Sequence, residues 1–288
     1  MYSRREFLKT CFKIGGYAGI ASLGIEAVYE AQAYGILHAV GTLTGGGAAG
    51  GFTAGANIYV CDFKQAAGNE TGSGLGLAGA DLVLTENGDP AAAAQDGNGN
   101  WYRTFDGTAD NFDGATNLAN TACSGAGGTY TIGIKLANLT DEISDAFIRL
   151  RDATNENQLM LTISGAGSTY GPQLKVGNVW KNPAATANNM SFGSAIPTWI
   201  LGWADGGVNN VRFAFTATDP VLSGSTYWNW STFAAGDRTE ATDAGNFNGV
   251  AWANEVCIGG ATGGAGGDII ANVYKVFFSN LCLVNNAA

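Results

Sequence analysis

The sequence predicts an all-β protein, an antiparallel β-sandwich of about a dozen short strands. Glycine accounts for 44 of the 288 residues, and only 13% are charged, against about 25% in a typical globular protein. A chain poor in helix-forming residues and rich in Gly, Thr, Asn, Val and aromatic residues favours strands and turns. The hydrophobic content of 46% argues against disorder, so we expect a folded β domain.

Residues 1–33 are predicted to be a twin-arginine (Tat) export signal. Positions 3–9 spell S-R-R-E-F-L-K and match the motif S-R-R-x-F-L-K at every fixed position. A weakly apolar, Gly-rich stretch follows, and Ala31-Gln32-Ala33 has the small-x-small pattern of a cleavage site. The alternative is an ordinary amphipathic N-terminal helix. The signal predicts export of the folded chain by the Tat translocase, to the periplasm, the cell surface or the medium.

The mature chain is expected to contain a Gly-rich leader or linker, residues 34–56, and one β-sandwich domain, residues 57–288. The leader is too rich in Gly to pack. Turn sequences such as E-N-G-D-P at 86–90 separate the strands of the domain. Alternating apolar and polar residues, typical of antiparallel strands with one face on a core and one in water, occur at 129–136, 146–151, 159–163 and 211–215.

Charge and hydropathy exclude two classes of partner. The formal net charge is −10 and no basic run follows the signal, whereas contacts to nucleic-acid phosphates need clustered Lys and Arg. No segment after the signal has the 18 or so consecutive apolar residues that a membrane span requires. We therefore expect neither nucleic-acid binding nor a membrane span in the mature chain.

Four cysteines follow the signal, and an even number in an exported chain predicts two disulfides. Three pairings are possible. Sequential pairing, Cys61 with Cys123 and Cys257 with Cys282, is preferred because the second pair brackets one hairpin-like unit. The alternative is four buried thiols, since a chain that folds before export in a reducing compartment must be stable without the bridges.

The order of features over residues 101–283 resembles a concanavalin A-like, laminin G-type jelly roll. The resemblance depends on TYTIGIKL at 129–136, on TWILGWADGGVNNVRFAF at 198–215, and on CIGG at 257–260 with GDIIANVYKVFFSNL at 267–281. These are core and turn patterns, so the resemblance implies a fold rather than a site, and the family spans lectins, adhesion modules and glycosidases. Two features depart from the family: Gly266-Gly267 replaces an aromatic–Gly pair, and Ile200 rather than His follows Trp199.

The inventory of titratable residues argues against an enzyme. His38 is the single histidine and lies in the leader, so a Ser–His–Asp or Cys–His system would lack its base. A zinc or iron site with two histidines is excluded as well. Glycosidases of the fold that the resemblance implies carry carboxylates on alternate residues of one strand, and no acidic residues here have that spacing. A glycosidase with carboxylates distant in sequence stays open.

Calcium is the one cofactor that the sequence favours. The segment D-G-N-G-N at 96–100 offers side-chain oxygens at alternate positions with Gly between them, which suits a loop wrapped around Ca²⁺. The resemblance also implies calcium in such loops. The alternative is turn chemistry without an ion. The candidate ligands are Asp96, Asn98, Asn100, Asp106, Asp110 and Asp113.

An aromatic segment is the candidate for ligand binding. Its two indoles would share one face of an extended strand, and flat indoles beside amides and carboxylates suit sugar rings. The alternative is that both indoles are core residues, as is assigned to Trp199 and Trp203. The candidate residues are Trp228, Asn229, Trp230, Glu240, Asp243 and Asn246.

These observations predict an exported, non-catalytic, lectin-like module that binds a glycan or a cell-surface partner, with calcium dependence left open. The alternative is a structural subunit of a surface layer or filament, a homo-oligomer in which the Gly-rich leader adds a strand to a neighbouring sandwich. An exported glycoside hydrolase is the third possibility.

Overall fold

The computed structural model describes residues 51–53, 55–76, 81–115, 129–140, 146–151, 157–166, 169–176, 179–181, 193–204, 210–242, 255–260 and 269–285. All of them belong to the second of two compact units, Ala49–Ala288. The predicted export signal and residues 34–50 of the predicted leader lie outside the described residues, so both stay predictions.

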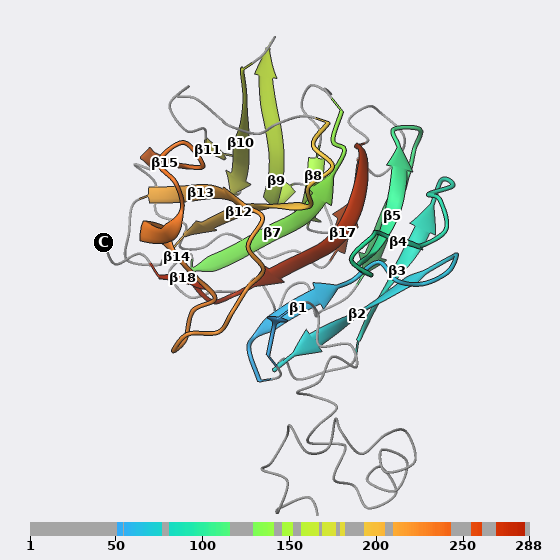
Figure 1. Ribbon diagram of the computed structural model, residues 1–288, viewed down its shortest axis with the longest axis horizontal. Helices are drawn as coiled ribbons and strands as arrows, with labels where there is room; N and C mark the ends of the chain where they lie inside the picture. Colours follow the sequence, from blue (N-terminus) through green and yellow to red (C-terminus); the bar gives the residue numbers. More distant parts are fainter. Residues whose placement is uncertain are drawn as a thin grey trace, which may run out of the picture. The chain divides into compact units, whose positions relative to one another are not determined.

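The predicted antiparallel β-sandwich is confirmed. Its strands form one continuous hydrogen-bonded path that folds into two layers, joined at the pair β2–β3 (Figure 1). The first layer contains β2 (Glu70–Leu75), β1 (Ile58–Cys61), β17 (Ile270–Ser279), β7 (Tyr130–Ala137), β12 (Thr198–Ala204), β13 (Asn210–Thr216) and β15 (Arg238–Thr242), while β5 (Trp101–Asp106) pairs with β17 and with β4 (Ala94–Gln95). The second layer contains β3 (Leu82–Asn87), β6 (Asn111–Ala115), β16 (Glu255–Ile258), β8 (Ala146–Arg151), β9 (Asn157–Ala166), β10 (Thr169–Val176) and β11 (Val179–Lys181).

The main core lies between the two layers, because each strand points alternate apolar side chains inward. Ile132 and Ile134 of β7 belong to this core. The layers meet closely at Gly202 of β12, where a Cβ atom would lie 3.4 Å from the δ-methyl groups of Leu161 and Leu174 in the other layer. The four alternating rows that the sequence predicted as strands are confirmed as β7, β8, β9 and β13.

A second core covers the outer face of the first layer. It is formed by the segment that contains β14 (Trp228–Asn229) and the 3₁₀ turn η3 (Trp230–Thr232), together with β18 (Val284–Asn285), which pairs in parallel with β14. The expectation that one face of each alternating strand meets water is therefore wrong for β7, in which Thr131 and Lys135 are also buried. The second core consists of Phe52, Ile58, Val60, Trp199, Leu201, Trp203, Ala214, Tyr227, Trp228, Phe233, Phe277, Leu283 and Val284.

Phe52, a residue of the predicted leader, packs into this second core. Its ring centroid lies 4.9 Å from that of Phe277 and 5.1 Å from that of Tyr227. The next residue is also held, because the backbone N–H of Thr53 donates to the Tyr227 hydroxyl at 2.8 Å. The packed domain therefore includes residues that precede its predicted start at 57.

Arg103 of β5 is a buried cation with a full set of hydrogen-bond partners. Its Nη1 lies 3.2 Å from Oε1 of the buried Glu70 in β2, and its Nη2 donates to Glu86 in β3. The guanidinium thus joins the strands at the corner where the two layers meet. The remaining donors bind the backbone carbonyls of Gly68, Pro90 and Ala91.

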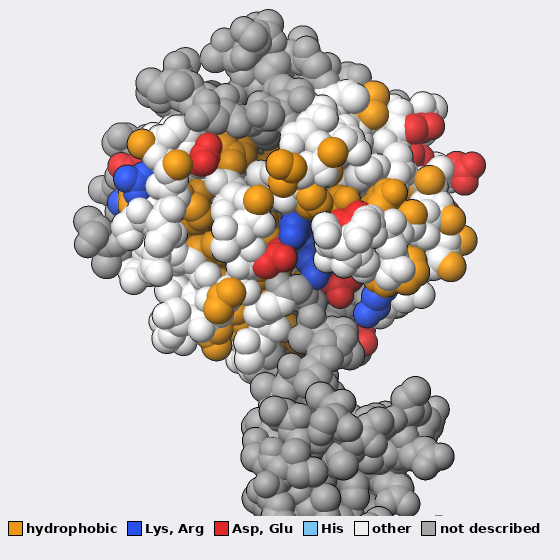
Figure 2. All heavy atoms as spheres, in the orientation of Figure 1, with side chains coloured by type: hydrophobic (Ala, Val, Ile, Leu, Met, Phe, Trp, Pro, Cys, Tyr) orange, Lys and Arg blue, Asp and Glu red, His pale blue; other side chains and the backbone are white. Residues whose placement is uncertain are grey.

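Charged side chains are sparse on the surface. On the face shown in Figure 2, some basic side chains lie beside acidic ones, and other acidic side chains stand alone among uncharged and hydrophobic ones. Within the described ranges, no helix has the length and hydropathy needed to cross a membrane.

Candidate functional site

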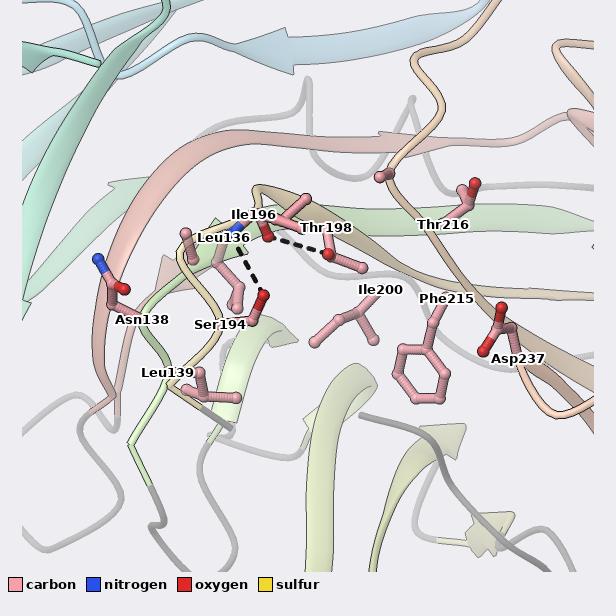
Figure 3. Close-up of a pocket in the computed structure, with 12 residues that line it drawn as sticks. Leu136, Asn138, Leu139, Ser194, Ile196, Thr198, Ile200, Phe215, Thr216 and Asp237 are labelled. Atoms are coloured by element: carbon pink, nitrogen blue, oxygen red, sulfur yellow. Dashed lines mark hydrogen bonds between the residues drawn. The ribbon is translucent and has the colours of Figure 1, made fainter. Parts of the chain in front are cut away.

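A pocket of about 260 Å³ lies at one end of the first layer (Figure 3). Antiparallel pairing brings the start of β12 beside the ends of two neighbours, because Thr198 pairs with Leu136 of β7 and Trp199 pairs with Thr216 of β13. Residues at these strand ends therefore surround one space. They are Leu136, Ala137, Asn138, Leu139, Ser194, Ile196, Thr198, Ile200, Phe215, Thr216, Ala217 and Asp237.

The floor of the pocket is apolar. Leu136, Leu139, Ile200 and Phe215 are each exposed by 5% or less and belong to the main core. The floor is thus the uncovered end of the packed interior between the layers. It offers apolar contacts to a ligand, and its conformation is held by the packing of the sandwich.

Polar groups surround the mouth of the pocket. Ser194 Oγ accepts a hydrogen bond from the backbone N–H of Ile196 at 3.2 Å, and Thr198 Oγ1 donates to the carbonyl of Ile196 at 3.0 Å. Thr216 alternates with the inward-facing Phe215 on β13, and its Oγ1 accepts from the N–H of Thr218 at 3.1 Å. The Ser194 and Thr198 hydroxyls keep hydrogen-bonding capacity for a ligand, because a hydroxyl can donate once and accept twice.

Backbone hydrogen bonds hold the two sides of the mouth together. The N–H of Asn138 donates to the carbonyl of Ser194 at 2.7 Å, and the N–H of Gly193 donates to the carbonyl of Leu139 at 2.8 Å. On the far side, the N–H of Phe215 donates to the carbonyl of Asp237 at 2.7 Å. These bonds position the polar side chains before any ligand arrives.

Asp237 is the one acidic residue among those that line the pocket. Its half-buried side chain lies beside the Phe215 ring (Figure 3). Within the described part of the chain, no hydrogen bond or ion pair engages its carboxylate. The carboxylate can therefore accept hydrogen bonds from hydroxyl groups of a ligand.

The two predicted ligand-binding indoles lie in different surroundings. The sequence placed them on one face of an extended strand, whereas the chain turns into η3 at Trp230. Trp228 is buried in the second core, stacked on Phe277 with ring centroids 5.7 Å apart, and its Nε1 donates to the carbonyl of Thr218. The described structure therefore assigns Trp228 the core role that the sequence left as the alternative.

Trp230 is half-buried, and its ring contacts two arginines. The Cζ atoms of Arg212 and Arg238 are 5.2 and 4.9 Å from its ring centroid, and the ring packs against the second core. Arg212 Nε donates to Glu240 Oε2 at 2.5 Å. The structure thus brings Trp230 and Glu240 together through Arg212.

The rest of the predicted ligand-binding set is less informative. Asn229 is half-buried at the end of β14. Asp243 and Asn246 lie outside the described residues. Ligand binding at these residues stays a prediction.

The first predicted calcium loop is an exposed turn closed by its own amides. Oδ1 of Asp96 accepts the backbone N–H groups of Asn98 and Asn100, each at 2.9 Å, and Oδ2 accepts from Nδ2 of Asn100 at 3.0 Å. The slight burial of Asp96 raises its pKa, but these hydrogen bonds outweigh burial and hold the pKa below its ordinary value.

In the second predicted loop, Asp110 organises the backbone. Its two carboxylate oxygens accept the N–H groups of Asp89 at 2.9 Å and Asp106 at 2.8 Å, although burial raises its pKa. Oδ2 of Asp113 accepts from Asn87 Nδ2 at 3.1 Å. Among the described residues, no three His, Cys, Asp or Glu side chains gather in a way that could hold a metal ion. The donor geometry favours turn chemistry, and calcium binding stays a prediction.

The predicted disulfide between Cys257 and Cys282 is wrong. Both residues are thiols, as is Cys61. Cys257 lies in β16 of the second layer, where its Sγ donates to the carbonyl of Gly260, whereas Cys282 follows β17 of the first layer and donates to the carbonyl of Val284. The two cysteines are close in sequence but belong to different layers. Cys123 lies outside the described residues, and its predicted partner Cys61 forms no disulfide.

The sequence did not single out the pocket residues. Alternation in 211–215 correctly pointed Phe215 toward a core, and the turn-forming residues after β7 and β13 marked strand ends. Nothing in these patterns says which strand ends meet, because that depends on the order of β7, β12 and β13 in the sheet. Only knowledge of which strands pair could therefore have located the pocket.

No protein-family model and no curated protein sequence matches this chain. Solved structures do resemble it. One is domain 4 of AbnA, a GH43 extracellular arabinanase from Geobacillus stearothermophilus, in complex with arabinotriose; it is 11% identical, with 68% of this chain and 78% of that chain covered at a TM-score of 0.43.

Two further structures are similar at the same level. The CBM2 module of the evolved Dit of Lactobacillus casei BL23 phage J-1 is 13% identical, with 71% of this chain and 83% of that chain covered at a TM-score of 0.38. The binding domain of botulinum neurotoxin serotype D/C is 7% identical, with a TM-score of 0.46; the match covers 77% of this chain but only 48% of the toxin domain.

Proposed function

We propose that this protein is an exported, non-catalytic carbohydrate-binding module that holds one sugar unit in the pocket at the ends of β7, β12 and β13. The observation that carries the proposal is the pairing of a nearly buried apolar floor with a mouth of hydroxyl, amide and carboxylate groups. Neither half alone would point to a sugar.

A sugar ring has the matching chemistry. Its C–H groups form apolar surfaces, while its hydroxyls donate and accept hydrogen bonds in directions set by the ring. The volume of about 260 Å³ lies just below the range of roughly 300–1,000 Å³ of pockets for drug-sized ligands. It therefore suits one sugar unit, with the rest of a glycan outside.

The carboxylate count favours binding over hydrolysis. Most glycosidases use two carboxyl groups on either side of the scissile bond, and among the residues that line the pocket only Asp237 is acidic. A single carboxylate at the mouth accepts hydrogen bonds from sugar hydroxyls but supplies only half of that catalytic pair.

The test is a glycan array followed by isothermal titration calorimetry with the mature chain. Ala217→Trp places an indole at an exposed position of the pocket and is expected to abolish binding without unfolding the domain. Ala66→Trp is the matched control, because Ala66 is also exposed and lies in the loop before β2; it should bind as the parent does.

Two results would count against the proposal. If no saccharide binds to folded protein, carbohydrate recognition is wrong. If Ala217→Trp binds as tightly as Ala66→Trp, the site lies elsewhere. Light scattering on the same samples tests the alternative of a filament or surface-layer subunit, since ordered polymers would favour it.

A further inference from the structure

We infer that the sugar unit enters the pocket with a methyl group pointing to the floor, so that the ligand is a 6-deoxyhexose or an acetamido sugar, and no hydroxymethyl arm meets the floor. This inference rests on the proposed function. It follows from which atoms form the floor and which form the mouth.

The side chains of the floor offer no hydrogen-bond partner to a polar group of the ligand. These side chains, from Leu136, Leu139, Ile200 and Phe215, contain only carbon and hydrogen. The nearby backbone groups are already engaged: the carbonyl of Leu139 accepts from Gly193, and the N–H of Phe215 donates to Asp237. A hydroxyl pushed onto this floor would lose its hydrogen bonds to water, whereas a methyl group would gain apolar contacts.

The mouth offers donors and acceptors to the ring hydroxyls. Ser194 accepts a backbone N–H, which leaves its O–H free to donate, and Thr198 donates to a carbonyl, which leaves its lone pairs free to accept. The Asp237 carboxylate accepts further hydrogen bonds. The polar part of a sugar is therefore held at the mouth, which directs its apolar substituent toward the floor.

Two more residues narrow the ligand class. Ile196 at the mouth is 64% exposed, so its side chain offers an apolar contact to a C–H face of the ligand. Asp237 introduces a negative charge, which disfavours sugars that carry a carboxylate or sulfate. The ligand is thus expected to be uncharged.

Matched sugar pairs test whether a methyl group meets the floor, and they require no mutation that could unfold the protein. L-Fucose and L-galactose differ only by the 6-hydroxyl, as do L-rhamnose and L-mannose, and N-acetylglucosamine differs from N-glycolylglucosamine only by a hydroxyl on the acyl carbon. We expect calorimetry to give affinities about 10–100-fold higher for the methyl-bearing member of at least one pair, the discrimination that an apolar pocket achieves against an added hydroxyl. The pair that discriminates identifies the source of the methyl group.

Variants tie this preference to the pocket. Ala217→Trp should remove binding of the preferred sugar. Ile196→Ser should weaken it about 5-fold through loss of apolar contact, while Val221→Ser, at a residue 70% exposed outside the pocket, should leave it unchanged.

The outcomes separate this inference from the proposed function. If both members of every pair bind equally and Ala217→Trp abolishes both, the methyl preference is wrong and the carbohydrate site stands. If charged sugars bind more tightly than neutral ones, the inference is also overturned. If no sugar binds, the proposed function itself fails.

Discussion

The backbone N–H of Asn138 donates to the carbonyl of Ser194 at 2.7 Å, while Asn138 itself has a φ of 53°. The bond joins the end of β7 to the segment that leads into β12, so it sets the spacing of the two sides of the pocket mouth. The left-handed conformation is costly for most residues, but Asn tolerates it better than others. The mouth therefore depends on the residue type at this position.

Substitutions at Asn138 should separate backbone and side-chain roles. Asn138→Gly keeps the conformation at little cost and removes the amide from the mouth, so saccharide binding should weaken while the free energy of unfolding changes by less than about 0.5 kcal/mol. Asn138→Val should cost about 1–2 kcal/mol, because a β-branched residue is strained at positive φ. Urea denaturation and calorimetry measure the two effects. Equal stability of the two variants would contradict this account.

The buried pair Arg103–Glu70 should be essential to the corner that joins the two layers. Glu70→Gln leaves the guanidinium buried with one carboxylate fewer, and removal of one partner of a buried pair costs about 3–5 kcal/mol. Lys275→Met is the control: it breaks the half-buried pair Lys275–Asp62, whose Nζ–Oδ1 distance is 3.4 Å, and should cost about 1 kcal/mol or less. Similar losses from both variants in chemical denaturation would argue against a special role for Arg103.

Phe52 should act as part of the domain rather than of a leader. Phe52→Ala removes a buried ring from the second core and should lower the free energy of unfolding by about 3–5 kcal/mol. Leu222→Ala changes a side chain that is 45% exposed and should cost less than about 0.5 kcal/mol. A chain that begins at residue 57 should be destabilised as Phe52→Ala is; full stability of that chain would show that Phe52 contributes nothing.

The cysteines should behave as thiols. Burial raises the pKa of Cys61 well above its ordinary value, so the reactive thiolate is scarce at neutral pH and the native protein should resist alkylation at this position. Cys282 is only half-buried and should react first. After denaturation without a reducing agent, mass spectrometry should find Cys61, Cys257 and Cys282 all alkylated. Detection of a peptide that links Cys257 to Cys282 would overturn this assignment.

The sequence predicted the sandwich because alternation is local. Rows such as Ile132–Ile134 and Phe213–Phe215 state which face of each strand is apolar, and the structure buries these residues between the layers. The alternation of apolar and polar residues does not show whether one or both faces of a strand are buried. The residues between β7's inward side chains are buried too, because segments distant in sequence contact them: Thr131 Oγ1 donates to the carbonyl of Leu281, and Lys135 Nζ lies 2.6 Å from Asp219 Oδ1.

Long-range features were not predictable in this way. An even cysteine count suggested bridges, but Cys257 and Cys282 belong to different layers. The two indoles at Trp228 and Trp230 had the chemistry of a sugar platform, yet the local turn places one in the second core and the other against two arginines. The pocket depends on which strand ends meet, and no single stretch of the chain contains that information.

The most direct test of the central claim is an NMR titration of isotope-labelled mature protein with the tightest-binding sugar from the glycan array. The account predicts that amide signals of Asn138, Thr198, Thr216 and Asp237 shift with a common dissociation constant, while those of the 96–100 turn and of η3 stay in place. Shifts confined to Trp230 and its arginine neighbours, with the pocket amides unmoved, would contradict it.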